Sequence, residues 1–130
     1  MSHYILDKAY TVMQSGGVSA FRVVAQGTNA GECVVPSGQN ADHILGVTTH
    51  AQDQYRNVSV RKAGVARVEA AGVIAVGAAV NVADATGKVK AIANETTNTK
   101  VKVLGFAETA STGDGDIIEV FIALHERIAP

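Results

Sequence analysis

The sequence lacks the residue types on which several classes of protein depend. Tryptophan is absent, aromatic residues make up only 5% of the 130 residues, and Cys33 is the single cysteine. One cysteine excludes an intramolecular disulfide and a zinc site built from several cysteines. Because Val34 and Val35 follow Cys33, we expect a small buried hydrophobe on a strand, in preference to a reactive thiol.

Charge of one sign and long apolar runs are also missing. The 11 lysines and arginines are balanced by 12 aspartates and glutamates, so we expect no nucleic-acid partner. No apolar run approaches the roughly 18 residues of a membrane span. The N-terminus lacks the charged-then-apolar pattern of a secretion signal. These absences predict a soluble protein without a membrane partner, made in the cytoplasm.

Residue patterns that bind metals or carry catalysis are absent as well. His43 and His50 have no partner at metal-ligand spacing, and a solvated histidine is the simpler interpretation. Asp114 and Asp116 do not complete the oxygen ligands of a calcium loop, so they favour a hairpin turn. No nucleophile elbow or phosphate-binding loop is present. The sequence therefore predicts no catalytic residue, no metal and no cofactor.

What the chain does contain is valine and alanine, which dominate its 47% of hydrophobic residues. β-Branched valine favours strands. Valine and alanine bury little area per side chain, so the core should be thin and its hydrophobic stabilisation modest. Association between subunits could add to the modest stability that such a core provides.

The central stretch, Ser59–Val82, shows this pattern most clearly. Apolar residues alternate with small or polar ones, which is the period of a half-buried strand. Gly64, Gly72 and Gly77 interrupt the alternation, so we expect two or three short strands joined by tight turns.

The remaining sequence continues in the same way, and no long helix is expected. Short apolar segments are separated by turn residues every eight to twelve positions or so, which favours an all-β sandwich or barrel. We therefore predict a compact barrel- or sandwich-like domain of short strands over residues 21–130. The other expected strands are Phe21–Ala25, Glu32–Val35, Ile44–Thr48, Lys88–Ile92, Val101–Phe106 and Ile117–Leu124, the last apolar on both faces and so buried.

Residues 1–20 show little periodicity and are predicted to be an extended N-terminal arm. Tyr4, Ile5 and Leu6 form a short apolar group in it. Exposed apolar side chains suit such an arm only if another surface covers them.

An internal repeat underlies the order of the segments. Three pairs recur at nearly one spacing: Phe21–Val24 with Val80–Ala83, Leu45–Val47 with Leu104–Phe106, and Val58–Val60 with Ile118–Val120. The pairs suggest an internal duplication, with halves at 21–70 and 74–124. A valine-rich β protein also aligns with itself to some extent, so this stays a hypothesis.

The charged residues of the central stretch have two interpretations. Arg61, Arg67 and Glu69 should point out of the strand face, where they are solvated or paired across strands. Alternatively they belong to an interface between subunits, because such interfaces are enriched in arginine.

Several segments together resemble a known family, the small capsid cement, or head decoration, proteins of tailed bacteriophages. The resemblance covers residues 58–124 and, more loosely, Leu45–Val47. It rests on Val60–Val80, the D-A-T-G-K-V turn at Asp84–Val89, Val103–Ala110 and the final strand at Gly115–Val120.

The resemblance implies a structural virion protein without enzymatic activity. It would form a homotrimer on the outer surface of the mature capsid, bind the major capsid protein and stabilise the shell. Tyr4, Ile5, Leu6 and Tyr10 are the candidate capsid-binding residues.

Two alternatives remain open. One is a β-barrel module that binds a ligand or glycan on a virion surface, although few aromatic side chains are available to stack on a sugar ring. The other is an enzyme of the swivelling-β type, but Lys88 and Lys90 lack the hairpin-tip context that a carrier lysine requires.

Overall fold

The computed structural model describes residues 5–38, 43–92 and 100–128. These ranges form nine β-strands and no helix, so the predicted all-β class is confirmed. It follows that no helix in the described ranges is long and apolar enough to cross a membrane. The strands are β1 Leu6–Val12, β2 Val23–Gln26, β3 Glu32–Val34, β4 Ile44–Thr48, β5 Asn57–Ala71, β6 Ala79–Val82, β7 Val89–Ala91, β8 Lys100–Ala107 and β9 Asp114–Ile128.

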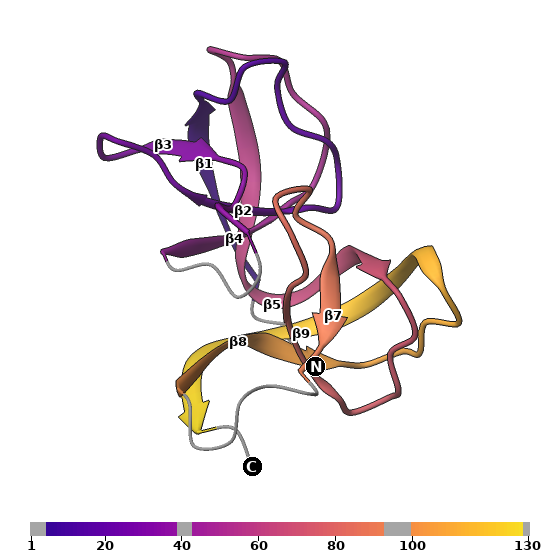
Figure 1. Cartoon of the computed structure of the whole chain (residues 1–130). Helices are drawn as coiled ribbons and strands as arrows, with labels where there is room; N and C mark the ends of the chain where they lie inside the picture. The colour runs from indigo at the N-terminus through magenta and orange to yellow at the C-terminus, as the bar shows by residue number, and fades with distance from the viewer. Residues whose placement is uncertain (1–4, 39–42, 93–99, 129–130) are drawn as a thin grey trace.

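The nine strands close into two five-stranded circuits, each a small barrel, that share the long strand β5 (Figure 1). In the first barrel the order is β1, β3, β2, β4 and β5, and β5 pairs again with β1. In the second barrel the order is β5, β7, β6, β8 and β9, and β9 pairs again with β5. Because each circuit is closed, most backbone N–H and C=O groups at the strand edges can pair within the chain. The predicted barrel-like domain is therefore confirmed.

The two barrels repeat one another in the direction of every strand pairing. In the first barrel β1 is parallel to β3 and antiparallel to β5. In the second barrel the C-terminal part of β5 is parallel to β7 and antiparallel to β9. All other pairs in both barrels are antiparallel. The two barrels therefore have the same topology, and β5 belongs to both. An internal duplication with halves at 21–70 and 74–124 stays a prediction.

Two glycines of the repeated segments occupy matching places. A Cβ atom added to Gly46 of β4 would lie 2.1 Å from the carbonyl oxygen of Arg61 in β5. One added to Gly105 of β8 would lie 1.9 Å from the carbonyl oxygen of Phe121 in β9. In each barrel, therefore, a glycine lets one strand approach the backbone of the next closely.

The proposed match of Phe21–Val24 with Val80–Ala83 is out of register. Val24 pairs with Gly46, and Val80 pairs with Gly105. Val24 and Val80 are therefore equivalent, and the expected match of Phe21 with Val80 is wrong. Valine-rich segments align about equally well in several registers, so only the pairing fixes the correct one.

The central stretch forms one long strand up to Ala71, and the prediction of several short strands there is wrong. Gly64 does not end the strand; it adopts a φ of 90° inside it. The positive φ bends β5 while both parts stay paired, the first with β1 and β4 and the second with β7 and β9. Gly64 therefore lies where the chain passes from one barrel to the other.

The segment predicted as an N-terminal arm is extended, but much of it is built into the first barrel. Leu6–Val12 forms β1, which pairs with β5 along its length and with β3 at its end. Tyr10, Val12 and Val18 are buried in the core of that barrel. Residues 6–18 therefore do not form a free arm, because β1 is paired with β5 and the side chains of Tyr10, Val12 and Val18 are buried within the domain.

The structure has two core clusters, composed largely of valine, as predicted from the composition. One lies in the first barrel and includes Val58, Val60 and Cys33. The other is built around Ile74 and Leu104 of the second barrel, and Val23 of β2 and Val47 of β4 extend it into the junction between the barrels. Cys33 is completely buried on β3, and desolvation raises the pKa of its thiol to about 11. It is a small core residue and not a reactive thiolate.

Backbone hydrogen bonds also join the two barrels. The amide of Glu69 donates to the carbonyl of Phe21 at 2.9 Å, and the amide of Val23 donates to the carbonyl of Gly87 at 2.9 Å. These bonds connect the chain before β2 to β5 and to the turn between β6 and β7. They hold the barrels in one arrangement, with a cleft between them.

Candidate functional site

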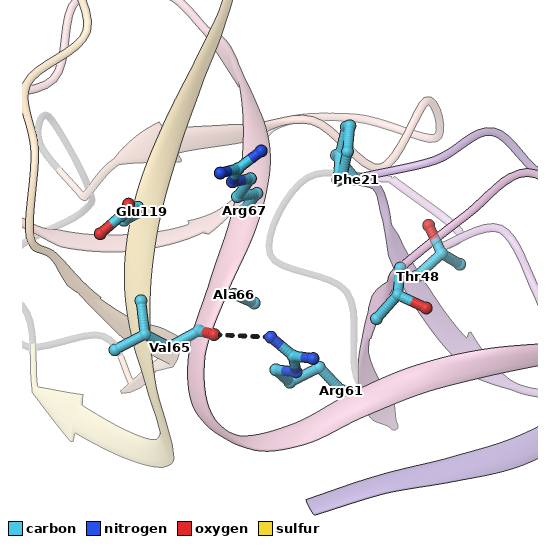
Figure 2. Close-up of a pocket in the computed structure, with 8 residues that line it drawn as sticks. Phe21, Thr48, Arg61, Val65, Ala66, Arg67 and Glu119 are labelled. Carbon is cyan, nitrogen blue, oxygen red and sulfur yellow. Dashed lines mark hydrogen bonds between the residues drawn. The ribbon is translucent and has the colours of Figure 1, made fainter. Parts of the chain in front are cut away.

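The cleft between the barrels lies beside the bend of β5 and has a volume of about 310 Å³. Figure 2 shows Arg61 and Arg67 of β5 on one side of it, with Phe21 and Thr48 on the other. The sequence did not predict this cleft, because its two sides come from different barrels. Its lining residues are Phe21, Thr48, Thr49, Arg61, Val65, Ala66, Arg67 and Glu119.

Arg61 fixes the bend of β5. Its Nε and Nη2 donate to the two carboxylate oxygens of Asp7 in β1 at 2.8 and 3.1 Å. Its Nη1 donates to the carbonyl of Val65 at 3.0 Å, across the bend (Figure 2). The hydrogen bond from Arg61 lowers the pKa of Asp7, and the bond to Asp7 raises the pKa of Arg61. Arg61 therefore connects β1 to both parts of β5.

The Asp7–Arg61 pair predicts a stability that depends on pH. Because the pKa of Asp7 is lower in the folded protein, its contribution is complete above the unfolded-state pKa of about 3.9 and is lost as the pH falls through the folded-state pKa. Both side chains are partly exposed, so Asp7→Asn should cost only about 0.5–1 kcal/mol at pH 7. Urea unfolding at pH 7 and at pH 2.5 should show the difference from wild type disappear at the lower pH.

A matched control is Asp53→Asn, since the carboxylate of Asp53 makes no ion pair among the described residues. It should leave stability at pH 7 nearly unchanged. If Asp7→Asn cost the same at both pH values, the ionised pair would not be the source of its effect.

Glu69 connects both barrels through ion pairs. Its carboxylate lies 3.2 Å from Arg22, which precedes β2, and 3.2 Å from Lys88, which precedes β7. Lys88 also lies 3.1 Å from Asp114 at the start of β9, and hydrogen bonds from Lys88 to Asp114 and Glu69 raise its pKa. The ion pairs of Glu69 therefore link the two barrels within one chain. The hydrogen bonds of Arg61 likewise link β1 to β5 within the chain.

Arg67 differs from its two neighbours in that its charge has no partner within the described residues. It lies opposite Glu119 of β9 in the strand register, and both side chains are exposed. No ion pair or hydrogen bond joins their side chains, and the carboxylate of Glu119 is directed away from Arg67 (Figure 2). Of the three predicted interface residues, Arg67 is thus the one whose charge is available.

Two phenylalanines lie exposed next to this pair of charges. Phe121 of β9 and Phe106 of β8 are opposite each other in register and 47% and 38% exposed. The ring of His125 stacks on Phe106 with centroids 5.7 Å apart. The prediction that Ile117–Leu124 is buried on both faces is wrong, because Ile118, Val120 and Ile122 point inward and Phe121 points outward. A run of apolar residues conceals this alternation in the sequence.

The candidate capsid-binding residues lie in different environments. Ile5 and Leu6 are about half exposed, as an interaction surface requires. Tyr10 is only 4% exposed and its hydroxyl accepts a hydrogen bond from Lys62, so its side chain belongs to the core and is not available to a partner. Tyr4 lies outside the described residues. A further exposed apolar pair, Val73 and Val76 in the loop after β5, was not predicted.

The residues considered for metal binding have ordinary structural roles. No group of three metal-ligating side chains occurs within 5–38, 43–92 and 100–128. Asp116 accepts hydrogen bonds from the amide and hydroxyl of Thr112, which lowers the pKa of Asp116 and closes the turn at the start of β9. The ring of His50 contacts the backbone of Ala51 and Ser59.

Comparison with known proteins shows that this chain is similar to proteins of the phage head. A family model described as phage cement protein matches residues 7–122. The N base of head fiber gp8.5 in bacteriophage phi29 has a similar structure, with a TM-score of 0.63 and 20% sequence identity. The alignment covers 91% of this chain and 95% of that chain. At this identity the likeness shows a shared fold alone. No curated protein sequence matches the chain.

Proposed function

Because the chain belongs to the phage cement protein family and has a structural role at the capsid, we propose that it binds the outer surface of the mature capsid as a homotrimer and stabilises the shell. The observation that carries the proposal is the family match, which includes strands of both barrels. The major capsid protein would be the partner. As a cement protein, the chain is a component of the virion.

Stabilisation would arise from multivalent binding. A trimer that contacts several capsid subunits gains avidity from contacts that are individually modest. Preference for the expanded shell follows if the contact sites are complete only in that state, since the protein then favours the state it binds. The small valine cores of the two barrels agree with a protein that gains stability from association.

Ile5 and Leu6 are the proposed capsid contacts of the first barrel. They are exposed at the start of β1, where Leu6 pairs with Ala63 close to the bend of β5. Arg61, Arg67 and Glu69 are the proposed residues at or near the interface between subunits. Arg67 would make a direct contact, whereas Arg61 and Glu69 are held in ion pairs and would support the surface around it.

The proposal predicts saturable binding of the purified protein to undecorated, expanded capsids. The double variant Ile5→Asp and Leu6→Asp should weaken binding at least about tenfold, because it removes two partly buried aliphatic contacts from each subunit. Cosedimentation of protein with capsids over a range of concentrations measures the affinity. Circular dichroism should show that the variant is folded.

The matched control replaces Val73 and Val76 by aspartate, which makes the same change at the exposed loop after β5. It should bind like the wild type. Absence of saturable binding by the wild-type protein would contradict the proposed function. A loss of binding in the loop variant alone would instead transfer the capsid contact to the second barrel.

A further inference from the structure

Arg67 and Glu119 form a pair of opposite charges that the chain leaves unpaired. They are directly opposite across β5 and β9, exposed, and without an ionic or hydrogen-bonded side-chain partner among the described residues. Other charged residues near the cleft are paired within the chain, Arg61 with Asp7 and Arg22 with Glu69. The surface therefore offers one positive and one negative group side by side.

An aromatic row adjoins these charges on the same outward face. Val65 of β5 lies opposite Phe121 of β9, and Phe121 lies opposite Phe106 of β8. Because side chains alternate along a strand, Arg67 is next to Val65 and Glu119 is next to Phe121 on that face. Two of the three phenylalanines of the chain are thus exposed beside a free arginine.

The third phenylalanine extends this surface into the cleft. Phe21 is half-buried and lines the cleft opposite Arg67 (Figure 2). None of the phenylalanines belongs to either core. The three phenylalanines therefore do not stabilise the cores. Exposed aromatic side chains beside an arginine are typical of protein interfaces, where these residue types contribute most of the binding energy.

We propose that this face, formed by Val65, Arg67, Phe106, Glu119 and Phe121, is the contact between copies of the chain. Charge complementarity favours a second copy as the occupant, because the face carries both signs equally. In a closed ring, Arg67 of each subunit would pair with Glu119 of the next, and the phenylalanines would be covered beside them. The inference rests on the proposed function for the number of copies, three.

Charge reversal tests the contact directly. Arg67→Glu and Glu119→Arg each place like charges together and should weaken association about tenfold to a hundredfold, as measured by sedimentation velocity over a range of concentrations. The double variant, Arg67→Glu with Glu119→Arg, restores opposite charges and should associate nearly like the wild type. Arg56→Glu, the same change at an exposed arginine of the first barrel, should have no effect.

The aromatic row is tested by Phe121→Ser, which should abolish association and leave the circular dichroism spectrum of a folded protein. Wild-type protein that is monomeric at every concentration would overturn the inference. So would single reversals that associate normally, or a double variant that remains dissociated.

Capsid binding by the same variants separates this inference from the proposed function. If the reversals abolish capsid binding without changing association, the face contacts the capsid, and the proposed function stands while the inference fails. If the reversal pattern holds but no variant and not even the wild type binds capsids, the contact between copies stands and the proposed function fails.

Discussion

Replacement of Gly105 by alanine is expected to lower the free energy of unfolding by about 3 kcal/mol or more. The new Cβ would lie 1.9 Å from the carbonyl oxygen of Phe121, and the next contact is also with backbone, so no side chain can move aside. β8 and β9 must separate at the point where their register shifts, between Val103 and Gly105. The second barrel would lose pairing on both sides of this point.

Thermal unfolding measures the effect, and the midpoint should fall by about 10 °C or more. Gly72→Ala is the control, because Gly72 has no atom within 4 Å of the added Cβ and no positive φ. It should change the midpoint little. Gly46→Ala, at the matching place of the first barrel, should resemble Gly105→Ala. Equal stability of the Gly105 and Gly72 variants would contradict the close approach of β8 to β9.

Replacement of Gly87 by alanine is expected to cost about 3 kcal/mol through the junction between the barrels. Gly87 has a φ of 83°, and an added Cβ would lie 2.6 Å from the carbonyl oxygen of Val23. The carbonyl of Gly87 also accepts the hydrogen bond from the amide of Val23. The substitution therefore strains the turn between β6 and β7 and pushes it away from the first barrel.

Gly77→Ala separates these two causes. Gly77 has nearly the same φ, 84°, but nothing lies within 4 Å of its added Cβ. It should cost only the conformational strain, about 1 kcal/mol. Urea unfolding of both variants should show the larger loss for Gly87. If the two losses were equal, the contact of the β6–β7 turn with Val23 would contribute nothing to stability.

Local patterns in the sequence were sufficient for the fold class and for most strands. The short apolar segment Ile44–Thr48 was predicted with the bounds of β4, and turn residues located the loops between strands. The resemblance to capsid cement proteins, based on residues 58–124, is confirmed by the family match over residues 7–122. These features depend on neighbours along the chain, which a single sequence contains.

Features that depend on pairing between distant strands were predicted less well. The sequence predicts that a strand ends at Gly64, because glycine weakens a strand and can mark either a turn or a bend. The burial of Tyr10 depends on the pairing of β1 with β5, and the exposure of Phe121 depends on which face of β9 lines the barrel. Neither register is encoded in a local pattern. The ion-pair partners of Arg61 and Glu69 could not be predicted either, because they lie in distant segments of the chain.

The surroundings of Arg67 were predicted only in part. Alternation along β5 correctly placed it on the outward face, with the suggestion of an interface. Its relation to Glu119 required the pairing of β5 with β9, and the adjoining cleft required the arrangement of the two barrels. A sequence shows which face a residue occupies more readily than which residue it meets there.

A cryo-electron microscopy reconstruction of mature capsids saturated with the protein would show whether the protein binds the capsid surface as a trimer. We expect added density on the outer surface, absent from undecorated capsids, with three copies of the two-barrel domain around each site. Density for single, separate copies would contradict the trimer. No added density at saturating protein would contradict binding to the capsid surface itself.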